Sequence, residues 1–217
     1  MPSWLRGKEK AKEVPVAAAA TGKAAASSEQ IELALLAGIR NGRRQDFEAL
    51  YRIYYPRLQR FLAHQMRHAE LIDEVLNDTL MVVWQRADSF EGGSKLSTWI
   101  FGIAYRKSMK ALSRLDLPQD DSEAEEQVDP GPGPEQQLGQ RELRARLLAV
   151  LGQLSAEHRA VVELCYFHDM AYGEIAQVVG CGAETVKTRM FYARRRLRGL
   201  LADLADSVVT SQDGESR

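Results

Sequence analysis

Cysteines, long apolar runs and a strong net charge are all scarce in this sequence, and each scarcity excludes a class of protein. Only two cysteines, Cys165 and Cys181, occur in 217 residues, so no disulfide framework is needed and a reducing cytoplasm is expected. No apolar run approaches the roughly 20 residues of a membrane helix, so no direct membrane insertion is expected. The Ala-rich start lacks the continuous apolar stretch of a secretion signal, and residues 1–28 are predicted to be a disordered tail.

The sequence also lacks the patterns that mark a catalytic or metal site. It contains no recognisable Ser-His-Asp set, paired carboxylates, zinc spacing or phosphate-binding loop. Cys165 and His168 lie three residues apart, but no second pair supplies further metal ligands, so packing and surface roles are favoured for both. A thiol enzyme using Cys165 is therefore a weak alternative. No catalytic residue, metal, cofactor or small-molecule substrate is predicted.

The net charge of -1 conceals two segments of opposite sign. The segment 115–137 holds eight acidic residues and no Lys or Arg, and is too rich in Pro and Gly to fold. The segment 184–199, by contrast, holds six basic residues against Glu184 alone. Because fields act locally, a nucleic-acid partner for the second segment remains compatible with the overall balance.

The stretch from Tyr172 to Arg198 indicates a helix-turn-helix. A short amphipathic helix runs into Gly180-Cys181-Gly182, and a second helix follows with apolar residues at steps of three and four. The opposite face of this second helix carries cations, a hydroxyl and two aromatics: Lys187, Thr188, Phe191, Tyr192, Arg195 and Arg198. Such a mixture can read base edges and hold phosphates. DNA binding is therefore favoured over a merely basic exposed face.

Three helices are predicted in the N-terminal half before residue 88. The first begins at an N-cap, Ser28, and ends near Asn41-Gly42; the second starts near Gln45 and contains Pro56, which should kink it. The third spans 69–87 and is apolar on several faces. Periodicity leaves open whether it is buried in its own bundle or forms an external docking surface.

A fourth helix follows Gly92-Gly93, with Ser97 or Thr98 as its expected cap, and runs to residue 114. Its inner face is predicted to hold Ile100, Ile103, Ala104 and Ala111, and its other face Thr98, Gly102, Tyr105, Arg106 and Met109. Aromatic rings interleaved with cations suit single-stranded nucleic acid. This signal is weak alone, and a Trp such as Trp99 is more often a core residue than a stacking platform.

These patterns predict an all-α chain of two small helical domains joined by a flexible acidic linker. The expected boundaries are 29–114 for the first domain, 115–134 for the linker, 135–204 for the second domain and 205–217 for a C-terminal tail. The second domain should contain a helix over LRARLLAVLGQL, another beginning at Ser155, and the helix-turn-helix.

Both domains resemble the extracytoplasmic-function (ECF, group IV) sigma factors of bacterial RNA polymerase. Three segments resemble successive parts of domain 2. The opening helix is resembled by DFEALYRIYYPRLQRFL, the polymerase-binding helix by IDEVLNDTLMVVWQRA, and the promoter-melting segment by FEGGSKLSTWIFGIAYRKSMKALSR. The stretch from Leu154 to Arg198 resembles domain 4. Both blocks in this order are more specific than a helix-turn-helix alone. An operator-binding regulator that works without polymerase is the alternative, but it leaves residues 92–114 without a role.

The resemblance implies an alternative sigma factor that directs promoter-specific transcription initiation in the bacterial cytoplasm. Its implied partners are core RNA polymerase, promoter DNA and an anti-sigma factor. Core polymerase binding would fall on Asp73, Glu74, Asn77 and Asp78. Melted minus-10 DNA would meet the loop 92–96 and its flank through Ser94, Lys95, Ser97, Thr98, Trp99, Tyr105 and Arg106. Minus-35 recognition would fall on Lys187, Thr188, Phe191, Tyr192 and Arg195.

Overall fold

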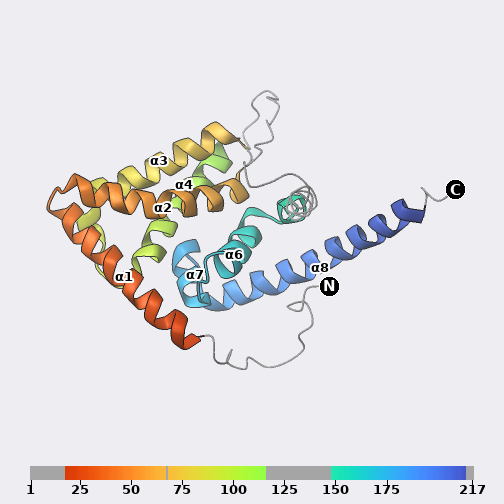
Figure 1. The fold of residues 1–217 in the computed structure, drawn as a ribbon. Coiled ribbons are helices and arrows are strands. Elements are labelled where there is room, and N and C mark those ends of the chain that lie inside the picture. The colour runs from red at the N-terminus through yellow and green to blue at the C-terminus, as the bar shows by residue number, and fades with distance from the viewer. Residues whose placement is uncertain (1–17, 67, 116–147, 214–217) are drawn as a thin grey trace. The chain divides into compact units, whose positions relative to one another are not determined.

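A computed structural model describes residues 18–66, 68–115 and 148–213, with side chains over 28–66, 68–114 and 148–202. Within these ranges the chain forms helices and turns without a strand (Figure 1), which confirms the all-α prediction. The helices are α1 (Ala18–Arg40), α2 (Arg44–Gln65), α3 (Ala69–Gln85), the 3-10 turn η2 (Ala87–Ser89), α4 (Leu96–Leu115), α6 (Ala156–Tyr166), α7 (Tyr172–Val179) and α8 (Ala183–Asp213). The predicted linker lies outside the described residues except for Leu115.

The backbone divides into two compact units at the step from Leu50 to Tyr51. The first unit contains α1, which buries Leu36 and Ile39. This helix begins at Ala18, so the prediction of Ser28 as its N-cap is wrong, and the helix starts inside the predicted tail. Alanine has the highest helix propensity, so the Ala-rich stretch continues the helix towards the N-terminus despite Gly22.

The second unit begins within α2, whose inner face buries Tyr54, Leu58, Phe61 and Leu62. Pro56 lies inside this helix, and the helix continues through it to Gln65. In α3 the buried face is Ile72, Val75, Leu76, Thr79, Leu80 and Val83, as the periodicity predicts. The Thr79 hydroxyl donates to the Val75 carbonyl at 2.7 Å, so its burial leaves no unpaired polar group there.

Helix α4 packs against α3 and continues the same core. Ile100, Ile103, Ala104 and Ala111 are buried as predicted, and the Phe101 ring meets Phe61 of α2 at 5.4 Å between centroids. The helix begins at Leu96. Ser97 and Thr98 therefore lie in its first turn, and the prediction that one of them caps it is wrong.

The second half of this unit forms the predicted helix-turn-helix. Residues 148–152 are helical, and α6 starts at Ser155, whose side chain accepts a hydrogen bond from the His158 amide. Between α7 and α8, Gly180 adopts a left-handed φ of 69°, which glycine tolerates at no steric cost. Helix α8 runs to Asp213. It passes the expected end at 204 because no Gly or Pro interrupts the chain between Gly199 and Gly214.

Helix α7 also packs against α4, a contact that the sequence did not predict. It covers part of the face of α4 that was expected to point outward. Thr98 is 2% exposed and Tyr105 is 7% exposed, so their predicted exposure is wrong. The amphipathic pattern marked one apolar face correctly, but the partner of the second face comes from about 75 residues further along the chain.

Candidate nucleic-acid interface

The outer face of α8 presents two large aromatic side chains to solvent. Phe191 is 62% exposed and Tyr192 is 52% exposed, with their rings 5.5 Å apart in an edge-to-face arrangement. On the opposite face, Val186, Met190, Ala193 and Leu197 are buried. The apolar face of α8 is already buried, so these two rings add an apolar surface that is exposed to water, which is unfavourable without a partner. The face is therefore suited to a partner surface with apolar and polar features.

Polar side chains of the same face are also exposed. Lys187 forms an ion pair with Glu184 one turn earlier, and the Thr188 hydroxyl donates to the Glu184 carbonyl at 3.0 Å. Both contacts are local and solvent-exposed, so each is worth at most about 1 kcal/mol. The Lys187 ammonium can exchange its carboxylate for a base edge or phosphate at little cost, and the Thr188 oxygen keeps its acceptor capacity.

Arg195 borders a hollow of about 510 Å³ at the side of this face. The hollow lies between the start of α6 and the middle of α8, and is lined by Gln153, Leu154, Ser155, His158, Tyr192, Arg195, Arg196 and Gly199. Two guanidinium groups at its wall give it positive charge. Arg195 is therefore placed one turn beyond the aromatic pair, where a phosphate backbone would pass if Phe191 and Tyr192 met base edges.

The four residues of the predicted polymerase-binding set lie together on the solvent side of α3. Asp73, Glu74, Asn77 and Asp78 are all exposed, opposite the buried face of the helix. Asp78 forms an ion pair with Lys107 of α4 at 2.8 Å. The side chain of Met81, at 52% exposed, adds an apolar group to the same solvent side.

The loop before α4 and the first turns of α4 enclose a hollow of about 330 Å³. Its lining combines four predicted minus-10 residues with neighbours from η2 and α7: Ser89, Phe90, Glu91, Gly93, Ser94, Thr98, Trp99, Gly102, Arg106 and Gln177. The Phe90 and Trp99 rings lie 5.6 Å apart at its wall. Aromatic rings and a guanidinium around a hollow form a suitable setting for an unstacked base.

Three other residues of the predicted minus-10 set do not line that hollow. Ser97 is half-buried in the first turn of α4, and Tyr105 lies beneath the second half of the unit. Burial raises the pKa of the Tyr105 phenol, and the neighbouring Arg189 guanidinium of α8 partly opposes that shift. Lys95 is exposed and forms an ion pair with Glu174 of α7 at 2.8 Å. The predicted set is thus divided between a hollow and a contact with α7.

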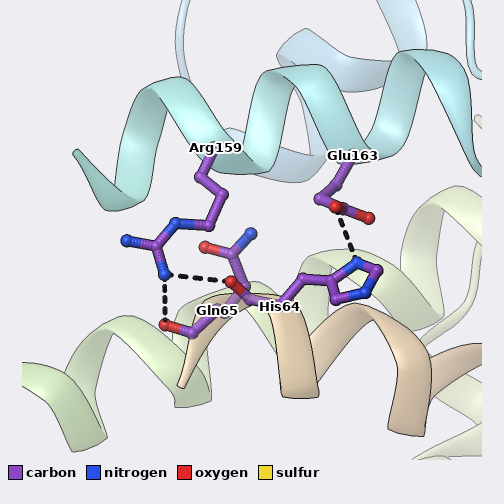
Figure 2. Close-up of polar contacts among 4 residues, drawn as sticks. All are labelled: His64, Gln65, Arg159 and Glu163. Atoms are coloured by element: carbon purple, nitrogen blue, oxygen red, sulfur yellow. Dashed lines mark hydrogen bonds and ion pairs between the residues drawn. The ribbon is translucent and has the colours of Figure 1, made fainter. Parts of the chain in front are cut away.

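A polar contact between α2 and α6 (Figure 2) was not predicted from the sequence. Arg159 of α6 donates to the His64 and Gln65 carbonyls at the end of α2, at 3.0 and 3.3 Å, and to the Gly152 and Leu154 carbonyls. His64 Nδ1 lies 2.6 Å from a carboxylate oxygen of Glu163, which is fully buried. A Glu within the apolar run VVELCY is the one signal that could have marked this contact.

His168, which follows α6, lies next to this contact and packs against rings of α2 and α4. Its ring centroid lies 4.5 Å from that of Phe101 and 6.0 Å from that of Phe61. Desolvation, followed by the positive charges of Arg57, Arg60 and His64, lowers the pKa of His168 to about 4. Its Nε2 has no hydrogen-bond partner within the described part of the chain. The ring therefore serves as a neutral packing group.

Comparison with known proteins places these features in a family. The model for Sigma-70 region 2 matches residues 50–117, and that for Sigma-70, region 4 matches residues 150–199. RNA polymerase sigma factor CnrH of Cupriavidus metallidurans is 31% identical over 144 residues, covering 60% of this chain and 73% of that protein. ECF RNA polymerase sigma factor RpoE of Cereibacter sphaeroides is 29% identical over 174 residues, covering 76% and 92%.

A solved structure supports the same assignment. The sigma factor RpoE of Bartonella quintana, in complex with the anti-sigma factor NepR, is 27% identical with a TM-score of 0.58, and the match covers 73% of this chain and 98% of that one. Two sigma-70 regions in this order define a transcription factor of the sigma-70 class. Within that class, the chain belongs to the ECF RNA polymerase sigma factors. Among the described residues, no helix is long and apolar enough to cross a membrane.

Proposed function

We propose that this sigma factor binds core RNA polymerase through α3, reads minus-35 duplex with α8, and captures melted minus-10 DNA with the loop before α4. The observation that carries the proposal is the exposed face of α8, where Phe191 and Tyr192 lie between cationic side chains in a chain that also matches region 2. A duplex-reading helix and a single-strand site in one chain supply two weak contacts that act together.

The minus-35 assignment rests on the division of chemistry along α8. Lys187, Thr188, Phe191 and Tyr192 occupy the exposed stripe, and Arg195 lies beside the positive hollow one turn later. A major groove admits one helix face, whose side chains meet base edges while flanking cations hold phosphates. The stripe would therefore set sequence preference, and Arg195 would set affinity.

The minus-10 and polymerase assignments rest on chemistry and position. Trp99, Arg106 and Ser94 surround a hollow that can hold a base. The exposed acidic and amide groups of α3 can form charge-assisted hydrogen bonds with a basic partner surface. Lys95 is exposed and follows Ser94 in the same loop, where its ammonium could hold the backbone of a melted strand.

The relatives suggest how such a factor is held in check. The RpoE structure from Bartonella quintana contains an anti-sigma factor, and we propose that an anti-sigma factor also binds this chain. We further propose that the protein acts in the bacterial cytoplasm, where polymerase and promoters meet. It acts by binding alone, because recognition of duplex and melted DNA requires no catalytic group of its own.

Transcription in vitro with core polymerase tests the proposal. Purified chain added to core polymerase on a library of promoter fragments should yield transcripts from a subset that shares two elements at a fixed spacing. A pull-down of core polymerase separates the alternatives, because an operator-binding regulator would bind DNA without retaining core. Sequence-specific duplex binding without core binding or initiation would overturn the proposal.

A further inference from the structure

The face of α4 next to the minus-10 hollow is covered by the second half of the same unit. Helix α7 packs on α4 so closely that a Cβ added at Gly102 would lie 3.8 Å from the Val178 Cα. Gln177 of α7 forms part of the wall of the minus-10 hollow, and Tyr105 lies under α8 beside Arg189. A Cβ at this position would make an ordinary van der Waals contact with the α7 backbone.

An ion pair draws one of the proposed DNA-binding groups into the same contact. The Lys95 ammonium lies 2.8 Å from Glu174 Oε1, and the other carboxylate oxygen of Glu174 accepts the Ala171 amide at 2.8 Å. Glu174 therefore caps α7 with one oxygen and holds Lys95 with the other. A phosphate approaching Lys95 would have to compete with this carboxylate.

On the side away from the hollow, α6 contacts the end of α2 through hydrogen bonds and an ion pair (Figure 2). The last turn of a helix has carbonyls without intrahelical donors, and the Arg159 guanidinium donates to those of His64 and Gln65. The Gln65 side chain, 2% exposed, lies against the start of α6, and His64 pairs with the buried Glu163. These groups fix α6, and with it α7, in one position over α4.

We propose that the second half of this unit is an autoinhibitory cover: in the free chain, α7 occupies the surface of α4 and the Lys95 side chain that melted minus-10 DNA requires. The inference rests on the proposed role of that surface. Helix α7 must leave before a strand can enter, so opening is a step in initiation. The frequency of opening is set by three contacts: those of Arg159, His64–Glu163 and Lys95–Glu174.

The cover leaves the other two proposed surfaces accessible. The acidic and amide face of α3 and the stripe containing Lys187 and Phe191 on α8 are exposed in the covered form. The covered chain can therefore still meet core polymerase and minus-35 duplex, but a melted strand cannot reach Lys95 or the face of α4 under α7. This selectivity distinguishes a cover from general misfolding.

A reversible disulfide between α4 and α7 tests the cover in the full-length chain. Gly102→Cys and Val178→Cys, combined with Cys165→Ser and Cys181→Ser, put two cysteines where a Cβ at residue 102 lies 3.8 Å from the Cα of residue 178, an approach close enough to attempt a disulfide. The cross-link should form readily in the free protein. Oxidation should reduce permanganate-reactive open complexes with core polymerase by at least about tenfold relative to the same protein treated with dithiothreitol. Binding of minus-35 duplex should be equal in the two forms.

Two other outcomes would contradict either the cover or the proposed function. Failure of the cross-link to form, or equal open-complex formation by oxidised and reduced protein, overturns the cover and leaves the proposed function intact. Failure of the wild-type chain to retain core polymerase refutes the proposed function itself, and the cover with it.

A second variant keeps the test decisive if the cysteine substitutions impair folding. Glu174→Gln removes the charge that holds Lys95 but retains an oxygen that can cap the Ala171 amide. Because an exposed ion pair contributes up to about 1 kcal/mol, open-complex formation should rise about two- to fivefold. Glu48→Gln is the matched control, since it removes the acid of the exposed Arg44–Glu48 ion pair of α2 and touches neither the cover nor a proposed DNA-binding residue. Equal rates for Glu174→Gln and wild type would contradict the cover.

Discussion

At the scale of single residues, α8 separates groups that could read sequence from groups that could only add affinity. Phe191 projects from the helix without packing against another element of the described chain beyond its neighbour Tyr192, as its 62% exposure indicates. Arg195 instead borders a positively charged hollow. The two kinds of residue should therefore respond differently to substitution, although only four positions separate them.

Replacing Phe191 or Lys187 with alanine should weaken binding to the cognate minus-35 element by about 1–3 kcal/mol and flatten the preference among its variants. The physical reason is the loss of a base-edge contact that other sequences do not offer. A binding series over single-base variants measures this effect. The melting temperature of Phe191→Ala should stay unchanged, and a destabilised fold with intact preferences would show that Phe191 is a packing residue.

Arg195→Ala should weaken all duplex sequences alike and lower the salt slope by about one unit, because a phosphate contact carries no sequence information. A salt titration on cognate and scrambled duplexes measures both effects. The neighbouring Arg198→Ala is a suitable comparison on the same helix. A loss confined to the cognate duplex would move Arg195 from the phosphate backbone to a base.

Asp78→Arg should weaken binding to core polymerase strongly, since an attraction is replaced by repulsion between like charges. The substitution also removes the ion pair with Lys107. Lys107→Gln controls for that loss, because it breaks the same pair and leaves the Asp78 carboxylate in place. Core binding measured for both variants should fall only for Asp78→Arg. Unchanged affinity in a well-folded Asp78→Arg protein would remove Asp78 from the polymerase surface.

At the scale of whole elements, the sequence predicted what each helix buries against its neighbours along the chain. The buried residues of α3 and the apolar face of α4 follow directly from spacing. The second contact surface of α4 could not be found in this way, because α7 comes from a distant part of the chain. Thr98 and Tyr105 are moderately polar, and nothing in their spacing distinguishes burial under another helix from exposure to solvent.

Helix ends were less predictable than helix faces. Helix α6 was expected to begin at Ser155 and begins one residue later with Ser155 as its cap, because a Ser followed by a regular apolar pattern is a local signal. The starts of α1 and α4 and the end of α8 differ from expectation by two to eleven residues. Where no strong cap or breaker is present, propensity extends a helix gradually and the sequence contains no sharp boundary.

The loop before α4 should act in melting or capture, and less in duplex binding. Lys95→Ala should reduce initiation on duplex promoters more than on templates with a preformed bubble, because unstacked bases become available only after opening. Initiation assays on matched templates measure the ratio. Glu174→Gln breaks the same ion pair but keeps the lysine. An equal defect on both templates, or none, would exclude the loop from melting.

At the scale of the whole molecule, the contact between the two halves contains a titratable group in an unfavourable setting. His168 faces Arg57 and Arg60 of α2, the rings of Phe61 and Phe101, and His64, which itself contacts Glu163. The covered form lowers the pKa of His168 from about 6.5 to about 4. Between those values the open form binds more protons than the covered form, so lowering the pH favours opening.

The ratio of open to covered chain should rise about fivefold as the pH falls from 6.5 to 5.5, if His168 acts alone. Energy transfer between dyes at the exposed positions Arg86 and Gly199, in a background lacking both native cysteines, measures that ratio. His168→Phe, which keeps a ring and cannot titrate, should flatten the response. A response that persists in His168→Phe would therefore exclude His168 as its source.

The polar contact between α2 and α6 also affects how the protein behaves in solution. When two halves held by apolar side chains separate, each exposes a surface that invites aggregation. Here the α2–α6 contact is made by Arg159, Glu163, His64 and backbone carbonyls, which water hydrates well once they are apart. On this side the chain can open and close repeatedly without exposing an adhesive patch.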